Sequence, residues 1–383
     1  MSEPRRFQTG SVLAISFAHL LHDVYSSFLA PILPLLIAKL RFGYGLAGAL
    51  SLAQRLPSLL NPLMGIIADR TSLRLFLVVS PSLTAVSMSL LGAAPHYTVL
   101  VLLCLVMGVS ATLFHVPAPV MIKEVSGDRV GKGMSFYMLG GELARTLGPL
   151  TILGAVSLWG LEGTYRLIPF GLLTSLVLHL RVRRIRLRGN DGRSVRTGMP
   201  RSQKRAWTVL FLTIGGFMTS RALMKAALTT FLPTYLTAQG ASLWTGGVSL
   251  ALLQLSGALG TLFCGSLSDR WGRRLTLVRI AAVSPFLMVL FMLVRGAAGL
   301  PVLFLLGFFV FAPNPVMLAL VQDLNSHRPA FLNGIYMTIN FSIGALANVG
   351  VGVLGDAIGL QPTYWIAAGL AFAAIPLAVS LKG

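Results

Sequence analysis

The stretch Gly65-Ile66-Ile67-Ala68-Asp69-Arg70 occurs a second time, two hundred positions later, as Gly265-Ser266-Leu267-Ser268-Asp269-Arg270. Each copy lies between two apolar runs, and the interval between the copies is about half of the 383-residue chain. A period of this length is too long for a solenoid repeat. It indicates two similar bundles of membrane helices joined in tandem, which is an architecture of transporters.

The composition excludes an ordinary soluble domain. Hydrophobic residues make up 55% of the chain and charged residues only 11%, whereas a soluble domain carries about 25% charged residues. Apolar runs long enough to cross the hydrocarbon core of a bilayer recur along the whole sequence. We therefore expect twelve membrane-spanning helices, at about residues 11–38, 44–67, 74–94, 98–122, 133–157, 163–181, 206–237, 243–266, 275–296, 300–322, 330–355 and 361–381.

Weaker internal matches keep the same order as the first one. Ser26-Ser27-Phe28-Leu29 in the first span resembles Thr229-Thr230-Phe231-Leu232 in the seventh, and Pro119-Val120-Met121 in the fourth resembles Pro315-Val316-Met317 in the tenth. These matches predict an all-α membrane protein of two pseudo-symmetric six-helix bundles. The predicted parts are an N-terminal bundle (1–180), a basic cytoplasmic linker (181–205) and a C-terminal bundle (206–383).

The net charge of +20 could suggest nucleic-acid binding, but its placement indicates membrane topology instead. If the amino terminus is cytoplasmic, 23 of the 31 Lys and Arg residues lie on the cytoplasmic side and only four lie on the opposite side. This is the positive-inside distribution of an inner-membrane protein. We therefore expect a multi-pass protein of a bacterial inner membrane with both termini in the cytoplasm and no nucleic-acid partner. No cleavable signal is expected, because the first apolar run is too long for a signal-peptide core.

Ionisable side chains inside the predicted spans are candidates for function, because charge in hydrocarbon is costly. Residues three or four positions apart share one face of a helix. Nine such groups are expected deep within spans: His19, His22 and Asp23 in the first, Arg55 in the second, His115 in the fourth, Glu142 and Arg145 in the fifth, and Arg221 and Lys225 in the seventh.

Cations exceed carboxylates among these groups, and unpaired buried charge is costly. Arginine forms forked contacts with carboxylate, phosphate or phosphonate groups. The excess therefore predicts an anionic or zwitterionic organic substrate. The alternative is that these groups pair internally and fix helix packing. The predicted substrate-binding residues are Arg55, His115, Arg145, Arg221 and Lys225.

Proton coupling requires a group that changes charge within the pathway. Asp23 lies beside His19 and His22 in the sequence, and Glu142 lies one helical turn from Arg145. We expect these two carboxylates and two histidines to couple transport to protons. In the predicted cycle, protonation of Glu142 frees Arg145 to hold the substrate, and release of the substrate reverses this step.

The loop stretches resemble the signature of the major facilitator superfamily. The second copy continues as Trp271-Gly272-Arg273-Arg274, and in that family the signature joins spans two and three and spans eight and nine. The resemblance covers essentially the whole chain and implies a cytoplasmic gate that holds one conformation and breaks in the other. The residues to which it assigns this role are Gly65, Asp69, Arg70, Gly265, Asp269, Arg270, Arg273 and Arg274.

Within this family, the chain is similar to the fosmidomycin-resistance branch of efflux proteins. The segments that carry this resemblance are His19-x-x-His22-Asp23, Ala30-Pro31-Ile32-Leu33-Pro34-Leu35-Leu36, Phe114-His115-Val116-Pro117, Gly140-Gly141 and Gly148-Pro149. The last pair also resembles, in part, the antiporter motif of drug–proton exchangers. The sequence departs from the pattern at Glu142 and Arg145. The family fold places spans 1, 4, 7 and 10 around a central cavity with spans 2, 5, 8 and 11 beside them, and all nine ionisable groups fall on these eight spans.

We therefore predict a proton-coupled antiporter that exports a small anionic or amphiphilic compound, such as a phosphonate-like drug, by alternating access. Its expected partners are protons, this substrate and membrane lipids, and we expect a monomer without a cofactor or a bound metal. The alternative within transport is a proton symporter that imports an organic anion. A divalent metal exporter and a membrane-embedded enzyme or sensor are weaker alternatives, because nearby cations would repel a metal ion and no P-loop or zinc-protease motif is present.

Overall fold

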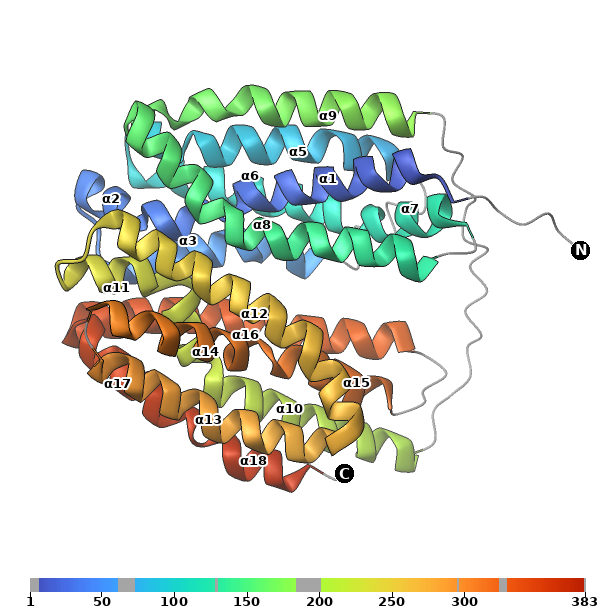
Figure 1. Cartoon of the computed structure of the whole chain (residues 1–383), viewed down its shortest axis with the longest axis vertical. Coiled ribbons are helices and arrows are strands. Elements are labelled where there is room, and N and C mark those ends of the chain that lie inside the picture. Colours follow the sequence, from blue (N-terminus) through green and yellow to red (C-terminus); the bar gives the residue numbers. More distant parts are fainter. Residues whose placement is uncertain are drawn as a thin grey trace, which may run out of the picture. The chain divides into compact units, whose positions relative to one another are not determined.

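The computed structural model describes residues 7–60, 73–127, 130–183, 201–294, 296–323 and 329–381, which are almost entirely helical and contain no strand (Figure 1). The predicted all-α class is confirmed. Within these ranges, nine helical segments are long and apolar enough to cross a membrane. Three further predicted spans correspond to the helices over 44–55, 130–159 and 168–182, so the total of twelve stays a prediction.

Contacts divide the chain into two compact units. The first unit comprises Met1–Phe42, Leu50–Asp191 and Ala241–Ala251, and the second comprises Gly43–Ala49, Gly192–Gly240 and Leu252–Gly383. Most of the predicted linker, residues 184–200, lies outside the described residues, so the predicted bundle boundaries stay a prediction.

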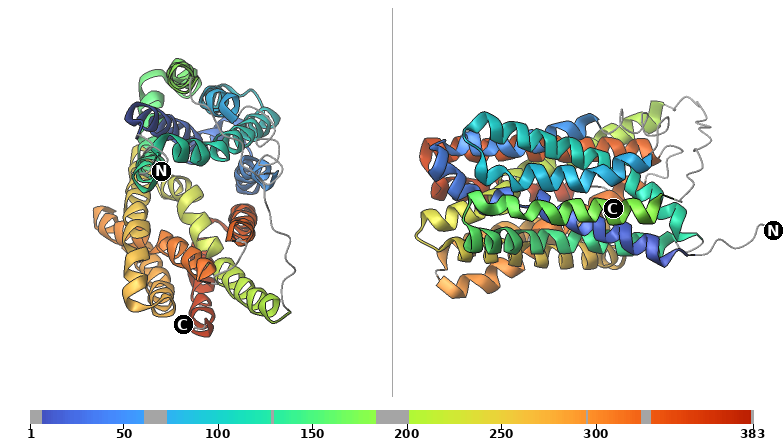
Figure 2. Two further views of the ribbon diagram at one scale, coloured as in Figure 1. Left: turned by 90° about the vertical axis from the view of Figure 1, so that its right-hand side faces the viewer. Right: turned by 90° about the horizontal axis from the view of Figure 1, so that it is seen from above.

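The first part of the chain forms eight described helices. They are α1 (Thr9–Ser26), α2 (Leu29–Leu40), α3 (Tyr44–Arg55), α5 (Leu73–Ser89), α6 (Tyr97–His115), α7 (Pro117–Ser126), α8 (Val130–Trp159) and α9 (Ile168–Val182). The second part forms α10 (Arg201–Ala226), α11 (Leu232–Ala238), α12 (Leu243–Trp271), α13 (Arg273–Leu293), α14 (Gly299–Phe311), α15 (Pro313–Gln322), α16 (Pro329–Ile358), α17 (Leu360–Ala371) and α18 (Ala374–Ser380). Within each unit, the long helices run roughly along one common direction (Figure 2).

Prolines divide the fourth and tenth predicted spans at corresponding places. Pro117 begins α7 directly after α6, and Pro313 begins α15 directly after α14. Proline lacks an amide hydrogen, so it leaves unpaired the carbonyl group four residues before it. This shared break supports the pseudo-symmetry that the sequence predicts.

Glycines on α8 bring it close to α1. A Cβ atom at position 140 would lie 2.6 Å from the carbonyl oxygen of Ser16, and one at position 148 would lie 2.6 Å from the Cβ atom of Ser27. Small residues allow such close approach in membranes, where helices associate through packing and not through the hydrophobic effect. The Gly-Gly and Gly-Pro segments of α8 therefore fix its position against α1.

Each unit has its own apolar core. In the first unit, α1, α5, α6, α8 and α9 converge on fully buried side chains that include Ile15, Leu77 and Phe114. In the second unit, α10, α13, α15, α16 and α18 converge around Phe217 and Tyr336. The candidate groups of the first span therefore lie on a helix that is packed on several sides.

The glycine contact predicts that Gly140→Ala lowers the thermal stability of the purified protein. The added methyl group would overlap the Ser16 carbonyl, and overpacking of this kind costs about 1–3 kcal/mol. Gly154→Ala on the same helix is the matched control, because nothing lies within 4 Å of its Cβ position. The control should keep or raise the melting temperature, and equal melting temperatures for the two variants would contradict the packing argument.

Candidate functional site

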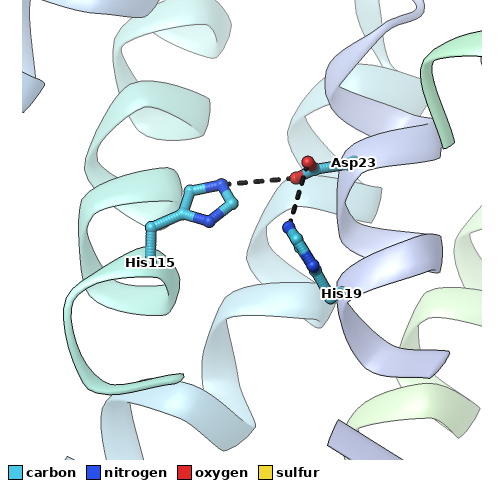
Figure 3. A group of neighbouring side chains, drawn as sticks. All are labelled: His19, Asp23 and His115. Atoms are coloured by element: carbon cyan, nitrogen blue, oxygen red, sulfur yellow. Dashed lines mark ion pairs between the residues drawn. The ribbon is translucent and has the colours of Figure 1, made fainter. Parts of the chain in front are cut away.

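A cluster of ionisable side chains lies inside the first unit, between α1 and α6 (Figure 3). The Asp23 Oδ2 atom lies 3.2 Å from His19 Nε2, and Asp23 Oδ1 lies 3.3 Å from His115 Nε2. The side chains of His19 and Asp23 are only 6% and 16% exposed, whereas His115 is 40% exposed. The structure thus brings a group from the fourth predicted span to the pair that the sequence places on the first.

Helix α8 holds the His19 ring from the other side. His19 Nδ1 lies 2.7 Å from the carbonyl oxygen of Tyr137, and the two rings stack with centroids 4.0 Å apart. A Cβ atom at Gly141 would lie 2.6 Å from Cε1 and 2.9 Å from Nε2 of the same imidazole. Tyr137 was not among the predicted site residues. Its position one helical turn before Gly141 is the signal that could have identified it.

His22 belongs to a separate hydrogen-bonded chain. Its Nδ1 atom lies 3.1 Å from Thr84 Oγ1, Thr84 donates to Ser110 Oγ at 2.7 Å, and Ser110 donates to the Ser80 carbonyl at 2.8 Å. Each hydroxyl group has one hydrogen, so both hydroxyl hydrogens are used and His22 Nδ1 must be the donor to Thr84. His22 is fully buried and its ring stacks on Phe114. Its Nε2 atom has no hydrogen-bond partner among the residues that the structure describes.

The fifth span carries an ion pair, as the spacing predicts. Glu142 Oε1 lies 2.6 Å from Arg145 Nη2, with side chains that are 17% and 40% exposed. Arg55 ends α3 at an exposed position, and its charge is disfavoured first by the apolar protein around it and second by the nearby charge of Arg145. Among the ion pairs of the described residues, none joins Arg55 to a carboxylate. The first unit therefore holds two interacting guanidinium groups and one carboxylate on α3 and α8.

Arg221 in the second unit lies in a different environment. It is 6% exposed, and its Nη2 atom donates to Ser284 Oγ and to the Phe309 carbonyl, both at 3.0 Å. Phe309 lies four residues before Pro313, so its carbonyl lacks the usual helical donor and Arg221 supplies one. This environment favours the alternative that Arg221 fixes the packing of α10, α13 and α14. Lys225, one turn later, is half-buried with its Nζ atom 5.6 Å from the centre of the Phe311 ring.

The second copy of the loop signature forms a set of ion pairs at the end of α12. Arg273 Nη1 lies 2.5 Å from Asp269 Oδ1, and Arg273 Nε lies 3.3 Å from Asp323 Oδ2. Arg273 thus joins the end of α12 to the end of α15, while Arg270 and Arg274 are exposed. The first copy, with Gly65, Asp69 and Arg70, lies outside the described residues.

Imidazole and carboxylate groups can also bind divalent metal ions. The nearest such atoms of His19, Asp23 and His115 all lie within 4.8 Å of one another. The sequence predicts no metal here because cations lie on neighbouring spans, and this absence stays a prediction.

The comparison with known families identifies the fold family. The model of the Major Facilitator Superfamily matches residues 15–348. The chain belongs to this superfamily. It is therefore a multi-pass membrane transporter and not an enzyme.

Similar proteins agree with this assignment. The chain is 26% identical to the fosmidomycin resistance protein of Escherichia coli (strain K12), over 95% of this chain and 90% of that protein. It is 29% identical to the multidrug resistance protein MdtG of Salmonella choleraesuis (strain SC-B67), over 45% of this chain and 44% of that one. Among solved structures, a bacterial homologue of the human lysosomal transporter Spinster, inward-facing and occupied, matches with a TM-score of 0.83 at 13% identity, over 97% of this chain and 96% of that one.

The environment of Arg221 predicts that Arg221→Met lowers the melting temperature. The substitution leaves the Phe309 carbonyl and the Ser284 hydroxyl without this donor, which costs about 1–3 kcal/mol for each buried group left unpaired. In a Pro313→Ala background the loss should be smaller, because the new amide hydrogen can donate to Phe309. Melting curves of the two single variants and the double variant measure this coupling. Strictly additive losses would contradict the proposed bond.

Proposed function

We propose that the protein is a proton-coupled antiporter that exports a small anionic or amphiphilic organic compound by alternating access. The observation that carries this proposal is the buried Asp23 carboxylate between His19 and His115. Ionisable groups within membrane helices are costly, and those that persist mark ion and substrate pathways. Membership of a transporter family, together with a titratable cluster in the first unit, supports coupling to protons.

An anionic substrate is supported by the cations of the first unit. Arg55 and Arg145 repel one another, and Glu142 is the carboxylate that pairs with Arg145. An anion that contacts both guanidinium groups would relieve this repulsion through forked hydrogen bonds. The relative from Escherichia coli is named for resistance to fosmidomycin. We therefore propose phosphonate-like drugs as the substrate class, with Arg55, Arg145 and His115 as the residues of the first unit that contact them. Lys225, in the second unit, stays a predicted substrate-binding residue.

In the proposed cycle, Asp23, His19 and His22 form the proton-binding region, and Glu142 couples it to the substrate. A proton on Glu142 would weaken the 2.6 Å ion pair and free Arg145 for the anion. Release of the substrate would restore the pair. The relatives named for drug resistance support export over the alternative of symport. The protein would act as a monomer in a bacterial inner membrane with both termini cytoplasmic, and its loop signature, including Gly265 and Asp269, would form part of the cytoplasmic gate.

Transport by purified protein in proteoliposomes tests the proposal, with fosmidomycin as the probe. A proton gradient should drive uphill movement of fosmidomycin. Asp23→Asn and Glu142→Gln should abolish uphill movement while counterflow persists, because exchange of substrate needs no net proton transfer. Glu162→Gln is the matched control and should transport normally. Its carboxylate is 73% exposed outside the candidate spans, where a hydrogen bond from Lys39 lowers the pKa of Glu162.

Substitution of the arginine tests the anion site separately. Arg55→Gln should raise the KM for fosmidomycin about tenfold or more, which corresponds to the loss of about 1.4 kcal/mol of binding free energy. The coupling to protons should remain, since Asp23 and Glu142 are intact. Uphill transport by Glu142→Gln would refute the cycle, and an unchanged KM in Arg55→Gln would remove that residue from the substrate site.

A further inference from the structure

We propose that, in this conformation, one transferable proton is held between His19 Nε2 and Asp23 Oδ2, and that the backbone of α8 at Tyr137 and Gly141 links this proton to the Glu142–Arg145 ion pair. The proposal deepens the proposed function and rests on it only for the role of the proton in transport. The location of the proton is argued from the hydrogen bond at His19 Nδ1 and from the distance between His19 Nε2 and Asp23 Oδ2.

The Tyr137 carbonyl determines which nitrogen of His19 carries a hydrogen. A carbonyl oxygen only accepts, and it lies 2.7 Å from His19 Nδ1 inside a buried site. Nδ1 must therefore be the donor, because two facing lone pairs at this distance would repel and remain unsatisfied. In a neutral imidazole only one nitrogen carries a hydrogen. It follows that neutral His19 would present a bare lone pair at Nε2.

That bare nitrogen would face another acceptor. Asp23 Oδ2 lies 3.2 Å from His19 Nε2, and an ionised carboxylate only accepts. The contact is satisfied only if one proton lies between the two atoms, either on Nε2 as an imidazolium or on the carboxyl oxygen as a neutral acid. In both cases the pair carries one proton more than neutral histidine with ionised aspartate.

The neighbouring groups do not need this extra proton. His115 Nε2 lies 3.3 Å from Asp23 Oδ1 without the geometry of a hydrogen bond. His115 can be neutral here, because its Nδ1 atom lies 3.3 Å from the Tyr137 hydroxyl, which can act as the donor. His22 donates through Nδ1 to the hydroxyl chain. These groups, from α1, α6 and α8, are the titratable neighbours of Asp23, and α5 contributes the Thr84 hydroxyl. The transferable proton is therefore assigned to the His19–Asp23 pair.

Protonation and deprotonation of the His19–Asp23 pair each transfer a single proton. On loading, a proton from water forms an N–H bond at His19 Nε2 or an O–H bond at Asp23, and the charge of the pair changes from −1 to 0. On unloading, that bond breaks and the proton returns to water. The unloaded pair then has two lone pairs 3.2 Å apart, so the two side chains must separate or admit a water molecule.

Movement of His19 is restricted on the side of α8. The ring stacks on Tyr137, and its Nε2 edge lies against Gly141, where even a methyl group would collide with it. Displacement of the ring therefore displaces α8 at these two residues. The next residue along α8 is Glu142, which forms the ion pair with Arg145. Proton loss at the first span would thus disturb the pair that the proposed function assigns to the substrate.

Nitrogen-15 NMR of histidine-labelled protein in lipid bilayers tests the proton location without any substrate. Over a titration from about pH 5 to about pH 9, His19 Nδ1 should keep its hydrogen throughout, while His19 Nε2 loses one proton in a single step. His19→Gln assigns the signals, and His96→Gln should remove only the two ring signals of that unrelated side chain. A His19 ring that carries its single hydrogen on Nε2, or an Nε2 atom that does not titrate, would overturn the proposal.

Two further variants make the test specific. Asp23→Asn replaces the carboxylic acid by an amide that can itself donate to Nε2, so the Nε2 step should disappear while the Nδ1 hydrogen remains. Gly141→Ala should shift the His19 signals, whereas Gly154→Ala should not. A step that persists in Asp23→Asn would refute the shared proton. Signals that change on addition of EDTA would also refute it, because they would show a bound metal in place of the proton.

The outcomes separate this proposal from the proposed function. If the Nε2 step occurs but fosmidomycin transport is independent of a proton gradient, the proton location stands and the coupled transport is refuted. If transport is driven by protons but His19 Nε2 does not titrate, the transport proposal stands and this proton location is wrong.

Discussion

The close contact of α1 with α8 is the constraint on which the rest of the first unit depends. Gly140, Gly141 and Gly148 leave room for the backbone of α1 and for the His19 ring. A side chain at any of these positions would push the helices apart and remove the Tyr137 carbonyl from His19. The glycines of α8 therefore determine how closely the Tyr137 carbonyl approaches His19 Nδ1. In this unit, the same glycines allow the close packing of α1 on α8 and the hydrogen bond of His19.

Two arginines of the predicted spans, Arg221 and Arg55, lie in different surroundings. Arg221 is enclosed and donates to a carbonyl group that a proline has left without a partner, so its bonds are satisfied by the helices around it. Arg55 is exposed and interacts unfavourably with Arg145. An enclosed, hydrogen-bonded arginine can fix the packing of helices, whereas we propose that Arg55, beside a like charge, contacts an anionic substrate. Arg221 and Arg55 carry the same charge and differ in the groups around them, which are hydrogen-bond acceptors for Arg221 and a second guanidinium group for Arg55.

The hydroxyl chain beside the cluster gives His22 a different set of hydrogen-bond partners from His19. Thr84 and Ser110 use their hydrogens in one direction and hold His22 as the donor at its start. His19 is instead held between a carbonyl and a carboxylate, which are both acceptors when the carboxylate is ionised. His19 and His22 lie three residues apart on one helix face but have different hydrogen-bond partners. The partner of His22 is the Thr84 hydroxyl of α5, and the partner of His19 is the Tyr137 carbonyl of α8.

The sequence by itself determined the membrane class, the tandem similarity, the family and the ionisable groups within the spans. The family follows from the resemblance of the loop motifs. The other features follow from composition, period and local spacing, as for Glu142 and Arg145 one helical turn apart. Only the tertiary structure placed His115 beside Asp23, provided the Tyr137 carbonyl, and enclosed Arg221 against Phe309. Local spacing specifies which residues share a helix face. It does not specify which helix covers that face, because the approach of helices depends on glycines and backbone carbonyls whose partners lie far away in the chain.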